Sequence, residues 1–117
     1  MDKHIEEKIF QMHAEVCKSM ANPTRLRIMN LLREGEKSVE ELRERLGLPK
    51  ANLSQHLGIL RDKGIVKTRR EGVMIYYSLA NPKIIKAFDI IREMLLEKLG
   101  QTEKLSRKAR ASKKGSG

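Results

Sequence analysis

The chain has 117 residues, a length that suits one domain and leaves little material for an enzyme cleft. Charged residues make up 34% of it and the formal net charge is +10, which favours a polyanionic partner, with nucleic acid ahead of an anionic membrane surface. The single cysteine excludes an internal disulfide, and the absence of a long apolar run or a secretory signal predicts a cytoplasmic protein with no membrane partner.

The first part of the chain has the apolar spacing of two consecutive helices. From about Lys3 to Met20, large apolar residues recur at steps of three and four, the period of one helix face. These residues are Ile5, Ile9, Met12, Val16 and Met20. Asn22 and Pro23 are typical of a helix N-cap and first helical position, and Gly35 is expected to end the helix that they begin.

Two shorter helices are predicted next. Ser38 and Glu41 have the spacing of a capping box, and the helix that they open is expected to reach Leu46. After a tight turn, another helix is expected from about Ala51 to Lys63. We expect the two helices to pack through their apolar faces. The residues concerned are Val39, Leu42 and Leu46 on the first helix and Leu53, Leu57 and Leu60 on the second.

The period then changes to that of strands. Residues 65–70 and 73–79 are rich in β-branched and aromatic side chains, and Glu71-Gly72 between them is typical of a hairpin tip. Asn81-Pro82 begins a last helix with apolar residues at helical steps, namely Ile84, Phe88, Ile91, Leu95 and Leu99. Residues 1–100 are therefore expected to form one mainly α domain with a β-hairpin, in the order α-α-α-α-β-β-α.

The sequence after Gly100 differs in composition. Six of its seven charged residues are basic, and it has almost no large apolar side chains. A segment of this kind cannot bury enough apolar surface to offset the loss of chain entropy on folding. Residues 101–117 are therefore expected to form a disordered basic tail that contacts DNA phosphates non-specifically.

Two short helices joined by a tight turn are typical of a helix-turn-helix, whose second helix enters the major groove of double-stranded DNA. The start of the second helix carries amide and hydroxyl groups that read base edges, preceded by a lysine placed for a phosphate. These candidate DNA-binding residues are Lys50, Asn52, Ser54 and Gln55. The spacing leaves one alternative open, a helical hairpin with a solvated polar face.

The predicted hairpin follows directly after this helix and carries Lys67, Arg69 and Arg70 near its tip. A cationic hairpin in this place is typical of a wing, which contacts the adjacent DNA backbone or minor groove. The alternative is an edge hairpin whose charges prevent aggregation. Both functions are compatible with the same residues.

Three segments resemble the ArsR/SmtB regulators. They are Met20–Met29, which contains Asn-Pro-Thr-Arg, Ala51–Leu60 in the predicted second helix of the helix-turn-helix, and Arg69–Leu79 in the predicted wing. The resemblance implies a winged helix-turn-helix repressor that dimerises through its first and last helices. In a chain this small, sharing the apolar stripes of those helices across a two-fold axis is favoured over burying them within one monomer.

The resemblance also implies DNA contacts at Ser54, Gln55 and His56, with Asn52 and Lys50 before them. Because His56 directly precedes Leu57, we favour a structural or phosphate-contacting histidine over a base reader. Arg25 is interpreted as a structural arginine that holds helices together.

The usual metal ligands of the family are missing. Its Cys-Val-Cys stretch appears here as Ser38-Val39-Glu40, and no histidine follows His56 for the site on the last helix. No cofactor is therefore expected at those positions. His13 and Cys17 remain as candidates for an atypical metal site completed by a partner chain, and Cys17 alone for a redox sensor. The alternative is an inert cysteine in the dimer helix.

These observations favour a sequence-specific repressor that binds an inverted-repeat operator as a homodimer. An architectural protein that coats DNA without sequence preference is the second hypothesis, and a protein-interaction module is the third. An enzyme is the least favoured, because the sequence has no phosphate-binding glycine loop and no nucleophile with an accompanying base.

Overall fold

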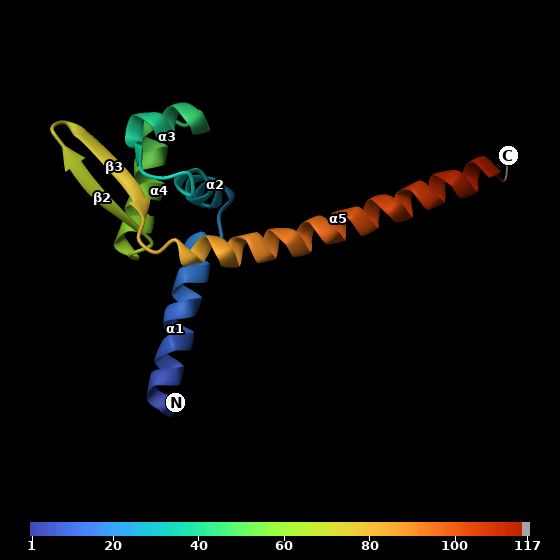
Figure 1. Cartoon of the computed structure of the whole chain (residues 1–117), viewed down its shortest axis with the longest axis horizontal. Helices are drawn as coiled ribbons and strands as arrows, with labels where there is room; N and C mark the ends of the chain where they lie inside the picture. Colours follow the sequence, from blue (N-terminus) through green and yellow to red (C-terminus); the bar gives the residue numbers. More distant parts are fainter. Residues whose placement is uncertain (116–117) are drawn as a thin grey trace. The chain divides into compact units, whose positions relative to one another are not determined.

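The computed structural model describes residues 1–115, which divide into a compact unit at Met1–Pro82 and a second unit that begins at Lys83. The first unit contains four helices and three strands (Figure 1). In chain order they are α1 (Lys3–Met20), α2 (Pro23–Leu32), β1 (Lys37–Ser38), α3 (Val39–Leu46), α4 (Lys50–Asp62), β2 (Val66–Glu71) and β3 (Met74–Leu79). The second unit is the single helix α5 (Lys83–Gly115). The predicted α+β class and order of helices and hairpin are confirmed.

Local capping fixes where three of the helices begin. The side chain of Asp2 accepts a hydrogen bond from the backbone N–H of His4, and that of Asn22 accepts from Thr24 and Arg25. At α3, the backbone N–H of Glu41 donates to Oγ of Ser38 at 3.1 Å. Each bond satisfies an N–H group that has no partner within its own helix. The caps at Asn22 and Ser38 are those that the sequence predicts, and the cap at Asp2 is an additional one.

The core of the first unit is organised around α2. This helix contacts both α3 and α4, and more extensively than α3 and α4 contact each other. The predicted packing between the two helices of the helix-turn-helix is thus largely mediated by a third helix. The side chains that meet there are fully or almost fully buried, and they are Ile28, Met29, Leu32, Leu42, Leu53, Leu57 and Leu60.

A three-stranded antiparallel sheet closes the other side of this unit. The strand order is β1-β3-β2, with Lys37 opposite Tyr77 and Arg69 opposite Tyr76. The sequence pattern did not predict β1, because a strand of two residues has no alternation to detect. Its Lys37 is buried and forms an ion pair of 3.0 Å with Glu34.

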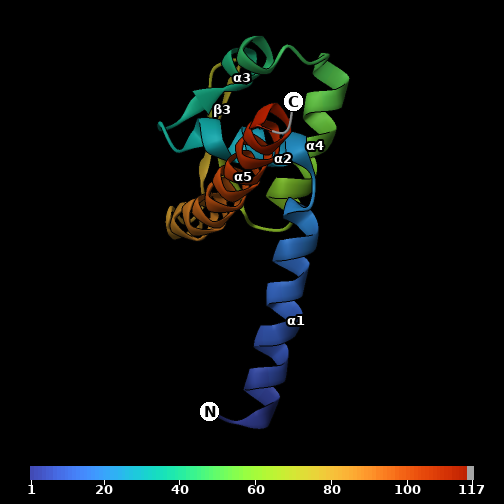
Figure 2. The same ribbon diagram turned by 90° about the vertical axis from the view of Figure 1, so that its right-hand side faces the viewer.

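Helices α1 and α5 carry large apolar side chains that are exposed to solvent. Figure 2 shows α1 extending from the other helices of its unit to the N-terminus. Large apolar residues of α1 and α5 are 46–65% exposed, and they are Ile5, Ile9, Phe10, Met12, Ile90, Ile91, Met94, Leu95, Leu96 and Leu99. The described helices include none with the length and apolar character needed to cross a membrane.

The sequence predicts a disordered basic tail after Gly100. Helix α5 continues through residues 101–115, and Oγ1 of Thr102 donates a hydrogen bond to the backbone oxygen of Lys98 at 3.0 Å. Between Gly100 and Gly115 the sequence has no glycine or proline and is rich in good helix formers, which explains the continuation. Ser116 and Gly117 lie outside the described residues. The boundary between the two compact units also falls after Pro82 rather than after Gly100.

The buried leucines of α4 give a direct test of this core. We expect Leu57→Ala to lower the free energy of unfolding by about 2–5 kcal/mol, because Leu57 is 1% exposed and its truncation leaves a cavity. Gln55→Ala, on the exposed side of the same helix, should change it by less than about 0.5 kcal/mol. Urea denaturation at one fixed protein concentration measures both. Equal effects of the two substitutions would contradict this assignment of the core.

Candidate DNA-binding interface

Helices α3 and α4 form a helix-turn-helix in which α4 presents its polar side to solvent. Gly47 adopts φ +63, a left-handed conformation that lets α3 end and the chain turn. Because Leu53 and Leu57 point into the core, Asn52, Ser54 and Gln55 lie on exposed sides of α4. Helical geometry places Gln55 opposite the buried leucines. These side chains therefore have the accessibility that base reading requires.

The N-terminus of α4 also favours an anion. Pro49 occupies the N-cap position, and no side chain caps the helix with a hydrogen bond. The first backbone N–H groups of the helix are therefore free of a capping side chain, and they add to the positive end of the helix dipole. Lys50, which begins the helix, is exposed beside them. Together these groups form a suitable binding site for a DNA phosphate.

His56 is part of a contact between three helices. Nε of Arg25 on α2 donates to Nδ1 of His56 on α4 at 3.2 Å, and Nη1 of Arg25 donates to the backbone oxygen of Ser19 on α1 at 3.1 Å. Burial, and secondarily the Arg25 charge, lower the pKa of His56 below its usual range. The imidazole is therefore held neutral, with its hydrogen on Nε2. Arg25 has the structural role that the sequence predicts for it.

Arg69 is held by other residues of the sheet. Its guanidinium forms ion pairs with Glu36 at 2.7 Å and with Glu71 at 2.8 Å, and it lies 4.6 Å from the centre of the Tyr76 ring. Hydrogen bonds from Arg69 to Glu36 and Glu71 raise the pKa of Arg69, and the bond to Arg69 lowers the pKa of Glu36. Two carboxylates therefore offset the charge of Arg69 before DNA is present.

Unlike Arg69, the cations Arg70 and Lys67 are not held by carboxylates of the sheet. Both are exposed on β2, and the described part of the chain gives neither of them an ion pair. Successive residues of a strand point to opposite faces, so Arg70 lies on the opposite face of the sheet from Arg69. Arg70 thus has its full charge available to a phosphate.

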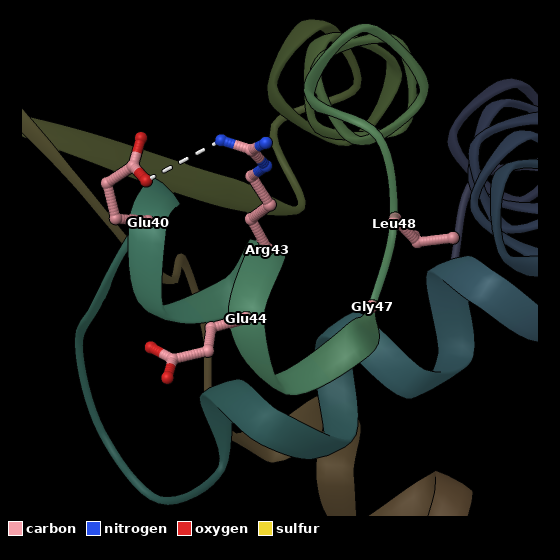
Figure 3. A pocket seen from close by; sticks show the side chains of 5 residues that line it. All are labelled: Glu40, Arg43, Glu44, Gly47 and Leu48. Carbon is pink, nitrogen blue, oxygen red and sulfur yellow. Dashed lines mark ion pairs between the residues drawn. The ribbon is translucent and has the colours of Figure 1, made fainter.

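An open hollow lies over α3 and the turn that follows it (Figure 3). The side chains of Glu40 and Arg43 point toward each other across it and form an ion pair of 3.9 Å. Its other lining residues are Glu44, Gly47 and Leu48. This hollow contains no nucleophile beside a base, and its charged groups are directed to each other and to solvent.

The two candidate sensor residues lie on α1. His13 and Cys17 are both exposed, and the described residues contain no group of three or more potential metal ligands. The structure therefore does not bring further ligands of the same chain to His13 and Cys17. The segment Ser38-Val39-Glu40 provides the N-cap and the first residues of α3.

Comparison with known proteins agrees with this geometry. The family model described as "Bacterial regulatory protein, arsR family" matches residues 22–68, from the N-cap of α2 to β2. The chain is 42% identical over 90 residues to the uncharacterized HTH-type transcriptional regulator Rv0081 of Mycobacterium tuberculosis. The matched region covers 76% of this chain and 79% of the relative. The chain belongs to the arsR family. It is thus a helix-turn-helix transcriptional regulator, and not an enzyme.

Other relatives of this arsR-family protein include a repressor and an activator. It is 40% identical over 85 residues to the transcriptional repressor PagR of Bacillus anthracis, with 72% of this chain and 85% of PagR covered. It is 39% identical over 79 residues to the transcriptional activator HlyU of Vibrio cholerae, with 68% and 73% covered. The direction of regulation therefore differs among proteins of similar identity to this chain.

Solved structures show the same fold. The crystal structure of M. tuberculosis Rv0081 matches with a TM-score of 0.71 at 40% identity and covers 80% of this chain and 94% of that one. The homodimeric winged helix-turn-helix DNA-binding domain of Mb0332 from Mycobacterium bovis matches with a TM-score of 0.74 at 30% identity, with 85% and 91% covered. The β2–β3 hairpin of this chain is accordingly a wing.

The contact between Arg25 and His56 predicts a pH dependence of stability. The pKa of His56 is lowered in the folded state, so the unfolded chain takes up the proton first as the pH falls. The contribution of His56 is fully present above its unfolded pKa of about 6.5 and is lost as the pH falls from there through the folded pKa. Wild-type protein should therefore lose stability over this range.

Denaturation midpoints measured between about pH 7 and 5 test this expectation. In His56→Gln the loss should be smaller, because glutamine keeps an acceptor for Arg25 but does not titrate. His13→Gln removes an exposed histidine of α1 and should keep the wild-type slope. Identical slopes for His56→Gln and wild type would contradict the assigned state of His56.

Proposed function

We propose that this arsR-family protein is a homodimeric repressor that binds an inverted-repeat operator. The observation that carries the proposal is the contrast on α4 between buried leucines and the exposed Asn52, Ser54 and Gln55. No partner within the described residues occupies these three side chains. Amides and hydroxyls on a free helix face match the donor and acceptor pattern of base edges in the major groove.

The cations around α4 support backbone contacts on both sides of the groove. Lys50 and the N-terminus of α4 provide one phosphate site, and Arg70 on β2 provides another. Lys67, two residues before Arg69, lies on the other face of the strand and offers a separate cation to the backbone. Arg69 stabilises the sheet through Glu36, Glu71 and Tyr76 and contributes less to DNA binding. His56 orients α4 through Arg25, with Nε2 remaining as a donor for a phosphate. Phosphate contacts of this kind fix the orientation of the protein on DNA.

The exposed apolar faces of α1 and α5 support the dimer. Ten large apolar side chains of these helices are about half exposed or more, which is unfavourable in water for a monomer. A two-fold axis lets identical faces cover each other. The related Mb0332 domain is homodimeric, and PagR is a repressor, which supports the same assembly and direction here. Two recognition helices in a dimer then face half-sites about 34 Å apart.

Selection of bound duplexes from a random DNA pool tests sequence specificity. At about 0.15 M salt, where non-specific phosphate binding is weakened, we expect enrichment of an inverted repeat. Retention of DNA without any enriched sequence would instead support an architectural DNA-coating protein. The selected operator, placed at the promoter of a reporter gene, then decides the direction of regulation: a repressor lowers the output, and an activator raises it.

Three substitutions separate base reading from backbone contact. Gln55→Ala should reduce discrimination by about 1–3 kcal/mol at the base pair that Gln55 contacts. Arg70→Ala should weaken binding to all duplexes and lower the salt dependence by about two for a dimer, because each protomer then neutralises one phosphate fewer. Arg69→Ala is the matched control, because its charge is already offset by Glu36 and Glu71. An equal reduction of the salt dependence in both arginine variants would refute this division.

The hypothesis of thiol sensing rests on the exposure of Cys17 on α1. It predicts that hydrogen peroxide, which oxidises a lone thiol to a sulfenic acid, releases wild-type protein from its operator and leaves Cys17→Ala bound. In reducing buffer both proteins should bind DNA equally. Release by zinc that is abolished in His13→Ala would support the metal hypothesis instead. Cys17→Ala that responds as wild type to oxidants would eliminate the sensor at this residue.

A further inference from the structure

The part of α5 beyond Gly100 carries a cationic helix face. Lys104, Arg107 and Lys108 are exposed and spaced by three and four residues, so they share one side of the helix. None of the three forms an ion pair within the described residues. Glu103 is the single acidic residue from Gln101 to the end of the sequence, against six basic residues.

Binding an external anion would reduce the repulsion among these three cations. Like charges three and four residues apart destabilise an isolated helix. The segment also has no apolar face with which to enter a membrane interface, because Leu105 is its single large apolar residue. Charge without an apolar face suits a polyanion in water, and duplex DNA carries one negative charge per about 1.7 Å of its axis.

We propose that residues 101–115 of α5 bind the backbone of duplex DNA that flanks the operator. This inference rests on the proposed function, since it extends the DNA contact of a regulator beyond the helix-turn-helix and wing. As a helix, the segment spans about 20 Å, comparable to about six base pairs of DNA. The contact lengthens the bound DNA and adds affinity without adding sequence preference.

The test compares two full-length variants that each lack two exposed charges. Lys104→Gln/Lys108→Gln changes the proposed face, and Lys3→Gln/Lys8→Gln changes exposed lysines of α1 as a control. Glutamine is a good helix former, so circular dichroism should be unchanged. Binding is measured on the selected operator alone and on the operator with about one DNA turn, roughly 10 base pairs, added to each side.

On the longer duplex, Lys104→Gln/Lys108→Gln should bind about ten-fold or more weakly, with the salt dependence lowered by about three to four for a dimer. On the short duplex it should bind as wild type, and the α1 control should match wild type on both. Unchanged binding to the longer duplex, or equal weakening on both duplexes, would overturn the proposal. If selection yields no operator, the proposed function fails. The cationic face is then tested by comparing Lys104→Gln/Lys108→Gln with wild type on random duplexes of the two lengths, where the variant should bind more weakly.

A second, independent observation concerns Gly58, in the interior of α4. Glycine there destabilises a helix relative to alanine. Gly58 has an ordinary helical conformation, and a Cβ built on it would meet nothing within 4 Å. The described part of the fold therefore gives no reason for glycine. Gly58 lies one turn from Gln55 on the side of α4 away from the leucines.

We infer that Gly58 is a specificity-determining residue whose missing side chain lets α4 approach the major-groove edge closely enough for Gln55 to reach a base. Gly58→Ala should then raise the urea midpoint of unfolding and yet weaken operator binding about ten-fold or more. Gly100→Ala, the same change in the interior of α5 with equally open space, should stabilise without affecting the operator alone. Operator binding unchanged in Gly58→Ala would overturn this inference.

Discussion

Burial of α2 against both α3 and α4 is the constraint on which the DNA-binding unit depends. Two short helices have too little mutual surface to hold each other at a fixed angle, and here they share the apolar face of a third helix. Ile28 and Met29 of α2 are completely buried. Close packing of this kind has few alternative arrangements, so the orientation of α4 follows from the shape of the α2 side chains. The packing of the apolar face of α4 against α2 therefore leaves the polar face of α4 exposed, and no further interaction is needed to orient it.

Polar contacts transmit this orientation to α1. Arg25 joins the C-terminal end of α1 to α4 through Ser19 and His56, and Glu15 forms an ion pair of 2.9 Å with Lys63 just after α4. The second pair is exposed and adds little stability by itself. The Glu15–Lys63 pair matters for its location. Like the Arg25 contacts, it connects α1, which has an exposed apolar face, to the helix α4 that carries Gln55. If α1 is a dimer helix, the spacing of two recognition helices is set through these contacts.

The sequence predicted the parts of the fold that depend on local chemistry. The caps at Asn22 and Ser38 and the glycine stops depend on nearby atoms, so their residue types locate the helix ends within a residue or two. Pairings across the chain were not accessible in this way. Neither β1 nor the clamp of Arg69 by Glu36 has a local signal, since both depend on residues more than 30 positions apart. For residues 101–115, the composition favours disorder, whereas the helix propensity favours the continuation of α5.

The same distinction helps to separate structural from DNA-contacting residues. Arg25, Arg69 and His56 have polar types that suit DNA, and sequence reasoning assigned two of them to it, but the fold itself accounts for each through hydrogen bonds or ion pairs. Gln55, Gly58 and Arg70 have no such explanation within the described residues. A side chain that the fold satisfies has already exchanged its water for protein, so it gains less from a phosphate or a base than one that is still solvated. We therefore expect DNA contacts chiefly from residues such as Gln55, Gly58 and Arg70, because no contact within the described part of the chain accounts for their residue type.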